Sequence, residues 1–469
     1  MKRRTKIVCT IGPACDNPEV LKKMISAGMN VARLNLSHGT HAEHEKKIQY
    51  LRNLSRETAI IADLQGPRIR TGSFKNKSAI LKDGAKVCLT AKNVLGDETI
   101  IPICPSSVIK DIKKGEHVFV DGGRIKIRID SAGKGQAMGT VMEGGEVGEH
   151  KGLNLPHSKL NLPSVTAKDL DDLLWAIKMG VDFVALSFVR KASDVLKVKK
   201  IIKKKRSMAY VIAKLEKPEA IKNLDEIIKA SDGVMVARGD LGIEISLAKV
   251  PVIQKEVIEK ARIYSKPVII ATQMLESMVK DEHPTRAEVS DVANAIFDGA
   301  DAVMLSEETA IGIHPVEVVK IMSRIATEAE RSIEYFTNTD HRRFSIDFSV
   351  SHAACSIAQE LGAKAIITFT ESGSTALRVS KYRPKTPIIG IVTKDETLRK
   401  LSLYFGLRAL KIKPFKYIDQ MIENAEVGLL KEKIVAKNDV VVLTAGIPIN
   451  IPGSTNLIKV HKIGAQLFR

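Results

Sequence analysis

The sequence predicts an α/β protein whose main domain is a (β/α)8 TIM barrel, with a small β-barrel lid domain inserted into it and an open α/β domain after it. Three observations support this prediction. Short apolar runs alternate with amphipathic stretches of helical length, which is the rhythm of βα units. Glycine-rich alternating strands interrupt this rhythm between residues 70 and 153. Polar residues gather where the apolar runs end, and barrel enzymes carry their sites at the carboxyl ends of the strands.

The first part of the barrel, residues 1–69, contains three strands and two helices. The strand TKIVCTIGP precedes a helix that Asn17 introduces and Pro18 opens, since proline favours the first helical position. Gly28 closes this helix. The strand NVARLNLSHG leads into a helix that reaches Leu54, and AIIADLQG forms the third strand.

The second region, residues 70–153, is typical of a small antiparallel β domain. It begins after Gly66-Pro67, a pair that favours turns. Its segments combine alternating apolar residues with glycine-containing turns: AILKDGAKVCLT, EHVFVDGGRIKIRID and GQAMGTVMEGGEV. We expect this domain to form a lid inserted after the third strand of the barrel.

The barrel resumes in residues 154–340. A capping box from Thr166 to Asp169 opens a helix that ends at Gly180, and its apolar face is expected to carry Leu170, Leu173, Leu174 and Ile177. Five strands follow, separated by stretches of helical length: DFVALSF, AYVIAKLE, GVMVARGD, PVIIATQM and AVMLSEETA. With the first three they make eight, the number that closes a (β/α)8 barrel.

The last region, residues 341–469, is expected to form an open α/β sheet of ordinary domain size. Helical stretches alternate there with five apolar runs: AKAIITFT, TPIIGIVT, LRALKI, DVVVLTAG and NLIKVHKIG.

Composition restricts the class of protein. The chain has 469 residues, enough for two to four domains, and 44% hydrophobic residues, as in a soluble globular protein. No apolar run approaches the length of a membrane span, and residues 1–6 lack the apolar core of a signal peptide. The five cysteines are odd in number and not spaced as CxxC, which favours a reduced, cytoplasmic setting without a zinc site.

The net charge of +19 is compatible with nucleic acid, an anionic membrane surface or small anionic substrates. The basic residues are spread along the chain, and their densest run, Lys199 to Arg206, fits the solvated face of a helix. Aromatic residues make up only 4%, too few for the stacking platforms that bind single-stranded nucleic acid. We therefore expect neither nucleic acid nor a membrane as a partner.

Three histidines, His38, His41 and His44, recur at the start of the second helix. Metal-binding histidines need further ligands at suitable spacing, and the sequence offers no acidic or cysteine partner at such a spacing. The pattern therefore favours a solvated helix start.

Two neighbouring strands of the predicted barrel end in chemically active residues. Lys214 and Glu216 end AYVIAKLE, and Arg238 and Asp240 end GVMVARGD. Any one of them alone is more often an ordinary loop charge. Two carboxylates at one mouth, however, suit a Mg²⁺ ion that keeps water ligands and binds substrate phosphate. The other strands end in Arg33, Asn35, Ser37, Asp63, Ser187, Thr272, Gln273, Ser306 and Glu308.

The chain resembles the pyruvate kinase family in seven motifs, which occur in this order: CTIGPA, NVARLNLSHG, DLQGPRIR, AKLEKPEA, MVARGDLG, ATQMLESM and AVMLSEETA. The match runs nearly end to end, and MVARGDLG and ATQMLESM are its most specific motifs. The resemblance implies phosphoryl transfer from phosphoenolpyruvate to ADP, giving pyruvate and ATP in the last step of glycolysis. It also implies a homotetramer.

The resemblance further implies a role for each residue at the mouth. Glu216 and Asp240 would hold Mg²⁺ or Mn²⁺, and Lys214 would stabilise the charge that develops on the enolate oxygen or the phosphoryl group. The catalytic residues would be Lys214, Arg33, Thr272, Ser306 and Glu308. Phosphoenolpyruvate would be bound by Arg33, Lys214, Gly239, Asp240 and Thr272, and ADP or ATP by Asn35, His38, Arg70 and Lys151.

One departure concerns potassium. In family members that need this ion, residues matching Asn35, Ser37, Asp63 and Leu64 surround it, and a glutamate stands at the position of Arg68. DLQGPRIR instead resembles the potassium-independent branch, which has lysine at that position. We expect the guanidinium of Arg68 to lie near Asp63 and to replace the ion, so that potassium is not required.

The third domain contains a candidate anion site around Gly373. Four hydroxyl residues, Thr370, Ser372, Ser374 and Thr375, lie between a strand and a helix, where backbone N–H groups bind anions. A single serine there would be an ordinary helix cap. The stretch resembles the effector site of allosteric pyruvate kinases. The closing loop GIPINIPGSTN has no arginine for a second phosphate, so a phosphorylated effector with one phosphate, a pentose phosphate or a nucleotide, is expected.

Two other functions fit parts of the sequence. A divalent-metal TIM-barrel lyase acting on pyruvate-like acids would share the Glu216 and Asp240 pair, but it needs neither a lid nor ADP. A basic nucleic-acid-binding protein would explain the net charge and would leave the clustered carboxylates unexplained.

Overall fold

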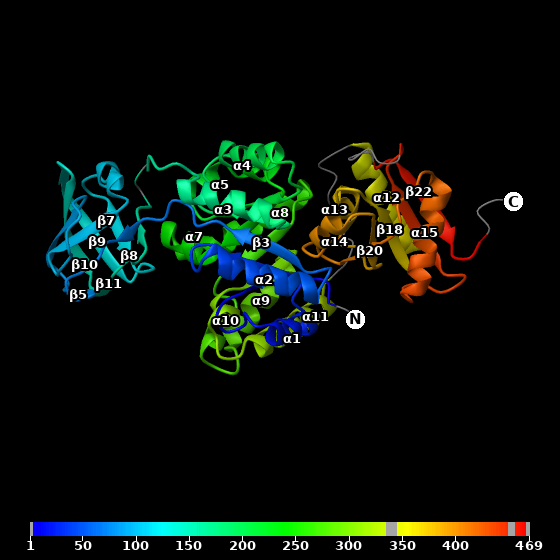
Figure 1. The fold of residues 1–469 in the computed structure, drawn as a ribbon, viewed down its shortest axis with the longest axis horizontal. Coiled ribbons are helices and arrows are strands. Elements are labelled where there is room, and N and C mark those ends of the chain that lie inside the picture. The colour runs from blue at the N-terminus through cyan, green and yellow to red at the C-terminus, as the bar shows by residue number, and fades with distance from the viewer. Residues whose placement is uncertain (1–2, 157, 159, 334–344, 449–454, 466–469) are drawn as a thin grey trace.

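A computed structural model describes residues 3–156, 158, 160–333, 345–448 and 455–465. The molecule is elongated and has three parts in a row: a β lid at one end, a barrel in the middle and an α/β domain at the other end (Figure 1). Of the predicted domain boundaries, 340/341 lies outside the described residues, and 69/70 and 153/154 remain predictions.

The middle part is the predicted eight-stranded barrel. Its strands are parallel and close in the order β1-β17-β16-β15-β14-β13-β3-β2. The strands span β1 Lys6–Thr10, β2 Val31–Asn35, β3 Ala59–Asp63, β13 Phe183–Leu186, β14 Tyr210–Leu215, β15 Gly233–Ala237, β16 Val268–Ala271 and β17 Ala302–Leu305.

Helices surround this barrel and follow its strands. They are α1 Pro18–Ala27, α2 His41–Leu54, α3 Ala167–Lys178, α4 Ala192–Lys204, α5 Pro218–Lys222, α6 Leu224–Ala230, α7 Arg238–Glu244, α8 Val250–Ile263, α9 Arg286–Asp298, α10 Glu307–Ala310 and α11 Pro315–Arg331, with 3₁₀ turns at Leu247–Lys249 and Glu276–Val279. The expected caps are present: Asn17 accepts from the Val20 amide, and Thr166 forms a capping box with Asp169.

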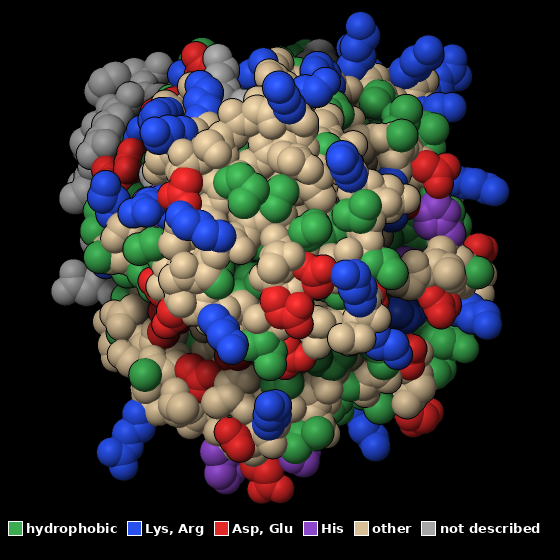
Figure 2. Space-filling model, turned by 90° about the vertical axis from the view of Figure 1, so that its left-hand side faces the viewer, with side chains coloured by type: hydrophobic (Ala, Val, Ile, Leu, Met, Phe, Trp, Pro, Cys, Tyr) green, Lys and Arg blue, Asp and Glu red, His purple; other side chains and the backbone are tan. Residues whose placement is uncertain are grey.

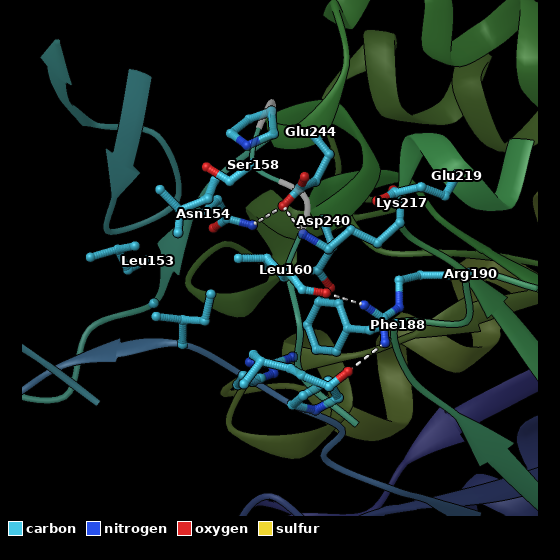
Figure 3. A pocket seen from close by; sticks show the side chains of 17 residues that line it. Leu153, Asn154, Ser158, Leu160, Phe188, Arg190, Lys217, Glu219, Asp240 and Glu244 are labelled. Carbon is cyan, nitrogen blue, oxygen red and sulfur yellow. Dashed lines mark hydrogen bonds and ion pairs between the residues drawn. The ribbon is translucent and has the colours of Figure 1, made fainter. Parts of the chain in front are cut away.

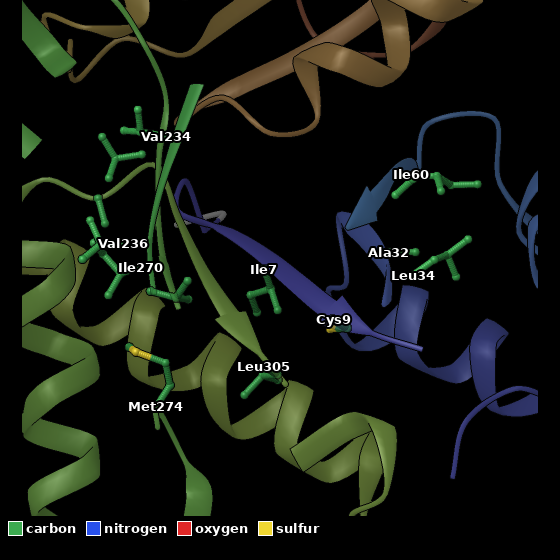
Figure 4. Packing of buried hydrophobic residues seen from close by; sticks show 14 of the residues in the cluster. Ile7, Cys9, Ala32, Leu34, Ile60, Val234, Val236, Ile270, Met274 and Leu305 are labelled. Atoms are coloured by element: carbon green, nitrogen blue, oxygen red, sulfur yellow. The ribbon is translucent and has the colours of Figure 1, made fainter. Parts of the chain in front are cut away.

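Side chains of the barrel strands alternate between two apolar layers, because successive residues of a strand point to opposite faces. Ile7 and Cys9 of β1 point outward against the helices, whereas Val8 belongs to the interior. Figure 4 shows further members of the outer layer, including Leu34, Val236 and Leu305. Both faces of each strand are thus buried, which explains why the strands were recognisable as unbroken apolar runs.

The buried face of α3 differs from the prediction. Leu170 and Leu174 are 41% and 36% exposed, while Asp169, Leu173 and Ala176 face the interior. A polar contact explains this difference. Asp169 accepts a hydrogen bond from the Gly66 amide at 2.9 Å, and this contact fixes the rotation of the helix about its axis. The predicted apolar face was therefore wrong for Leu170 and Leu174.

The lid consists of a seven-stranded sheet, in the order β12-β8-β9-β10-β6-β7-β4, and a two-stranded sheet of β11 and β5. An antiparallel bridge from Arg70 to Gly152 brings the two edges of the larger sheet together. Most strand pairs are antiparallel as expected, but β6 and β7 are parallel. The elements are β4 Arg70–Thr71, β5 Ser78–Leu81, β6 Lys86–Thr90, β7 Ile100–Cys104, a 3₁₀ turn Ser106–Asp111, β8 His117–Val120, β9 Ile125–Gly133, β10 Gln136–Glu143, β11 Gly145–Gly148 and β12 Leu153–Asn154.

The third part is an open five-stranded sheet in the order β20-β19-β18-β21-β22, with only β22 antiparallel. It faces the amino ends of the barrel strands, since the hydroxyl of Tyr210 donates to the carbonyl of Ser372 at 2.8 Å. The lid therefore covers the opposite, carboxyl ends. The elements are α12 Ile346–Glu360, β18 Ala365–Phe369, α13 Ser374–Ser380, β19 Ile388–Val392, α14 Asp395–Leu401, β20 Leu407–Lys411, α15 Ile418–Lys431, β21 Val440–Ala445 and β22 Leu457–Lys462.

Two surface observations bear on partners. Over the end of the molecule that carries the lid, basic and acidic side chains are interspersed (Figure 2), unlike the continuous basic face of a nucleic-acid-binding domain. Among the helices that the structure describes, none combines the length and apolar character of a membrane-spanning segment.

Candidate active site

The carboxyl ends of β2, β3 and β14 bring four charged side chains together in the interior. Lys214 Nζ lies 2.9 Å from Glu216 Oε1 and 3.2 Å from Asp63 Oδ1. Arg33 donates through Nε to Asp63 Oδ2 at 2.6 Å. All four side chains are at most 10% exposed. Two cations thus face two carboxylates, with Asp63 held by both cations.

The charges in this cluster are unequally compensated. Burial would raise the pKa of Asp63, but Lys214 and Arg33 hold it below its usual value. Burial would lower the pKa of Lys214, but the carboxylates of Asp63 and Glu216 raise it. Glu216 differs, because burial and the negative charge of Asp240 raise its pKa despite the nearby Lys214. Asp240 is therefore close enough to act on both, and Lys214 alone does not offset the effect of burial and of Asp240 on Glu216.

The two carboxylate oxygens of Glu216 have different partners. Its Oε2 accepts from the backbone amide of Phe188 at 2.8 Å, and Phe188 adopts a positive φ of 54°, which is strained for a bulky residue. Its Oε1 lies 2.9 Å from Lys214 Nζ and has no other partner among the described residues. A buried carboxylate oxygen in this state suits a metal cation.

Asp240 lies in the first turn of α7, directly after β15. The adjacent Gly239 donates its amide to Thr272 Oγ1 at 2.8 Å, and Thr272 itself adopts a positive φ of 69°. Arg238 lies apart from the carboxylate cluster and forms an ion pair with Asp291 at 2.7 Å. The sequence-predicted Gly239, Asp240 and Thr272 thus lie side by side, and the Gly239 amide already has a partner.

Ser306 and Glu308 meet at the end of β17, but not through the serine hydroxyl. Glu308 Oε2 accepts from the Ser306 amide at 2.6 Å and Oε1 from the Leu275 amide at 3.2 Å. Burial raises the pKa of Glu308. The hydroxyl of Ser306 is buried and makes no hydrogen bond to any residue that the structure describes, so the structure brings the two residues together without linking hydroxyl to carboxylate.

One contact expected at the monovalent-ion group, that of Arg68 with Asp63, differs from the prediction. Asn35 Oδ1 accepts from the Ser37 amide at 3.2 Å, and the Leu64 carbonyl accepts from Ser187 at 2.7 Å. Arg68 does not pair with Asp63 among the described residues; Arg33 and Lys214 hold that carboxylate instead.

Arg68 points elsewhere because Gly66, with φ of 70°, turns the chain before it. Its guanidinium lies 6.0 Å from the Phe188 ring and lines the pocket between barrel and lid, and its buried Nε has no hydrogen bond. The predicted contact of Arg68 with Asp63 was therefore wrong.

Three of the predicted nucleotide-binding residues lie on the lid side of the mouth. Arg70 donates to the His150 carbonyl at 2.9 Å, and Lys151 Nζ lies 3.2 Å from Asp121 Oδ1. The pKa of His38 is lowered by partial burial and by the positive charges of Arg70, Arg68 and Arg33. Positive charge thus accumulates where the lid meets the barrel.

The three histidines His38, His41 and His44 differ in how far they are exposed to solvent. His44 is buried and contacts the His38 carbonyl at 2.8 Å, whereas His41 stacks on Trp175 and bonds Asp172 at 2.8 Å. The acidic partner that the sequence lacked nearby comes from α3. The expected solvated helix start was therefore wrong for His44, whereas His38 is exposed and the side chain of His41 remains 36% exposed.

The candidate effector loop uses most of its hydroxyls internally. Thr370 accepts from the Gly373 amide at 2.9 Å, Ser372 donates to Ser374 at 3.1 Å, and Thr375 lies 2.9 Å from Thr455. Gly373 has a φ of 92°, which glycine adopts readily. Of the loop expected to close over this site, residues 449–454 lie outside the described residues.

Sequence reasoning missed three residues beside the site. Lys217 and Asn154 both contact the buried carboxylate of Glu244 in a cavity of about 60 Å³ between barrel and lid (Figure 3). One signal was available, because Glu244 stands one helical turn after Asp240 and therefore on the same face of α7. The contact with Asn154, from a distant strand, had no local signal.

The chain matches known proteins over its full length. A family model described as "Pyruvate kinase, barrel domain" matches residues 2–319, and one described as "Pyruvate kinase, alpha/beta domain" matches residues 349–461. The pyruvate kinase of Geobacillus stearothermophilus is 44% identical, covering 100% of this chain and 82% of the relative. That of Thermotoga maritima is 44% identical, covering 98% and 100%. The crystal structure of a pyruvate kinase from Cryptosporidium parvum superimposes with a TM-score of 0.92 at 37% identity, over 98% of this chain and 96% of that one.

Proposed function

The chain belongs to the pyruvate kinase family, and we propose that the residues at its barrel mouth transfer the phosphoryl group of phosphoenolpyruvate to ADP. The observation that carries this proposal is the placement of Lys214, whose ammonium is buried between Glu216 and Asp63. Phosphoryl transfer depends on positioning and on stabilising negative charge, and a buried, compensated ammonium serves both.

Glu216 and Asp240 fit a divalent cation. Glu216 is fully buried, and burial and the negative charge of Asp240 raise its pKa, so a further positive charge beside it is favourable. These carboxylates would hold Mg²⁺ or Mn²⁺, both of which prefer oxygen ligands. When bound, the ion supplies positive charge for the oxygens of the transferring phosphoryl group.

Lys214 and Arg33 supply the fixed positive charge. Lys214 stays protonated because Asp63 and Glu216 raise its pKa, and it stabilises the enolate oxygen as the phosphoryl group leaves. Asp63 holds Arg33 by its Nε, which orients the guanidinium toward the phosphate. Removing one such donor typically slows turnover by roughly a hundred- to a thousandfold.

The carboxylate of phosphoenolpyruvate would bind at the start of α7, with the Gly239 and Asp240 amides as donors. Thr272 Oγ1 holds the Gly239 amide at 2.8 Å and would yield it to the substrate. Thr272 would then lie beside the enolate carbon that is protonated, with Ser306 and Glu308 as the proton relay. The unpaired hydroxyl of Ser306 supports this assignment.

ADP would bind between lid and barrel at Asn35, His38, Arg70 and Lys151. The positive charges of Arg70, Arg68 and Arg33 that act on His38 support a phosphate-binding role. Potassium is not required on this proposal, because Arg33 and Lys214 already compensate Asp63.

The loop from Thr370 to Thr375 would bind the phosphate of an effector, such as a pentose phosphate or a nucleotide. The active protein would be a homotetramer. Support for the effector site comes from the clustering of the hydroxyls around Gly373, whose internal hydrogen bonds the phosphate would replace. A titration with sugar monophosphates and AMP that leaves the apparent affinity for phosphoenolpyruvate unchanged contradicts the effector site.

The experiment that tests the proposed reaction is a coupled assay of pyruvate release from phosphoenolpyruvate. Strict dependence on ADP, with one ATP formed per pyruvate, is expected. Pyruvate release without ADP would favour the lyase alternative.

A further inference from the structure

Glu244, the last residue of α7, receives two donors on a single oxygen. Lys217 Nζ donates to Oε1 at 2.6 Å and Asn154 Nδ2 donates to the same atom at 2.7 Å (Figure 3). Glu244 is 4% exposed and Lys217 9%. Hydrogen bonds to a buried carboxylate are charge-assisted and stronger than neutral ones, so this junction is a firm contact.

The three side chains come from different parts of the molecule. Asn154 belongs to β12, which pairs with β8 in the lid sheet. Lys217 directly follows Glu216, and Glu244 stands one turn after Asp240 in the same short helix. The junction therefore connects the lid to both segments that carry the carboxylates proposed to hold the metal.

The lid end of the junction is also next to the proposed nucleotide contacts. Lys151 lies three residues before Asn154. Arg70 is paired with Gly152 in the antiparallel bridge that joins the two edges of the larger lid sheet. The backbone of the lid also approaches α7, since a Cβ added to Gly123 would lie 4.0 Å from the side chain of Ile243. An orientation fixed at Asn154 is therefore transmitted to Arg70 and Lys151.

We propose that Glu244 is a positioning residue that sets the orientation of the lid relative to Asp240, with Lys217 as its fixed partner on the barrel and Asn154 as its partner on the lid. This inference rests on the proposed function for its effect on nucleotide binding, because Arg70 and Lys151 are the residues that it positions. Its geometric part, the orientation of the lid, is independent of activity.

The two oxygens of Glu244 differ in their contacts, and only one of them takes part in the junction. Oε2 is buried and has no hydrogen bond among the described residues, so all of the compensation of this carboxylate comes through Oε1. Lys217 can remain on Oε1 when the lid turns away, since both residues belong to the barrel. Asn154 is then the contact that forms or breaks with the lid.

The chain offers its own probes for lid orientation. Trp175 is its single tryptophan and lies in α3 of the barrel, while Cys104 is an exposed thiol in β7 of the lid. An acceptor dye on Cys104, in a C88S background that removes the half-buried second lid thiol, reports the distance from barrel to lid by energy transfer from Trp175. The other three cysteines are buried.

The test compares N154A, N154D and the double variant N154D/E244Q with the control N161A. Asn161 hydrogen-bonds Asp111 of the lid at 3.1 Å and does not contact Glu244. N154D places a second carboxylate against Glu244, and the double variant exchanges amide and acid to restore the hydrogen bond.

We expect energy transfer to change in N154A, to change more in N154D and to return toward the parent value in N154D/E244Q. The KM for ADP should rise by about fivefold or more in N154A, the size expected for one lost hydrogen bond, with the KM for phosphoenolpyruvate unchanged. Energy transfer in N154A equal to that in the parent would overturn the junction. Altered energy transfer with an unchanged KM for ADP would overturn its positioning role, and absence of turnover in the parent chain would instead refute the proposed function.

Discussion

Lys214 Nζ lies 3.2 Å from Asp63 Oδ1, and the two side chains are 5% and 2% exposed. Because Asp63 also holds Arg33, this carboxylate aligns both of the cations that are proposed to face the substrate.

Replacing Lys214 by methionine should lower kcat by roughly a hundred- to a thousandfold, because the charge that develops on the enolate oxygen loses its buried donor. Steady-state turnover of phosphoenolpyruvate plus ADP measures this. The control is K46M, which changes an exposed lysine of α2 in the same way and should retain the parent rate. A K214M variant with normal kcat would contradict the assigned role.

Thr272 should contribute through its hydroxyl. T272A frees the Gly239 amide and removes the group beside the enolate carbon, so kcat should fall by about a hundredfold, the usual effect of losing a positioned proton-transfer group. T272S keeps the hydroxyl that accepts from Gly239 at 2.8 Å and should retain most of the activity. Equal rates in the two variants would show that the hydroxyl is not needed.

Potassium should not change the rate. Asp63 is already compensated by Arg33 and Lys214, so no vacancy for positive charge remains at that carboxylate. Turnover measured in a buffer free of sodium and potassium should equal turnover with potassium added. A strict requirement for potassium would refute this.

Lys400 should make the stability of the protein depend on pH above neutrality. It is 1% exposed, its Nζ lies 3.6 Å from the centre of the Tyr210 ring and has no hydrogen bond within the described part of the chain, and burial lowers its pKa to about 8. The unfolded chain, with an ordinary lysine pKa of about 10.4, binds more protons than the folded one between these values. The free energy of unfolding should therefore rise with pH from about 8 to about 10.4, by at most about 3 kcal/mol from this residue.

The measurement is denaturant unfolding of the parent and K400M at several pH values. The variant should show a smaller rise over this range and should be the more stable of the two at pH 7, because it no longer buries a charge. The exposed Lys203 of α4 provides the matched control K203M. Parallel pH profiles for the parent and K400M would contradict the assignment.

The sequence predicted the fold where one element carries its own signal. The barrel strands are apolar on both faces, and the caps at Asn17 and Thr166 are local motifs, so these elements were predicted correctly. The predicted orientation of a side chain or helix was wrong where a contact with a residue distant in the sequence determines it. The rotation of α3 follows from Asp169 binding Gly66, and His41 finds its acidic partner in Asp172.

The same distinction applies to the site. Lys214 and Glu216 were expected to meet because they stand two residues apart at the end of one strand, and Asp240 because neighbouring strands of a barrel end at one mouth. Arg68 was misplaced because the turn at Gly66 directs it away from Asp63. The junction of Asn154 with Glu244 depends on how the lid is placed on the barrel, and no local pattern encodes that.

The central claim is that Glu216 and Asp240 share one divalent ion beside Lys214. Titration of Mn²⁺ binding, followed by electron paramagnetic resonance without substrate, tests it most directly in the parent, E216Q, D240N and the control E219Q, which changes another carboxylate lining the neighbouring pocket. One site per chain should be present in the parent and E219Q, and it should be at least about tenfold weaker in E216Q and in D240N, as for the loss of one charged ligand. Mn²⁺ binding of equal strength in all four proteins would contradict the claim.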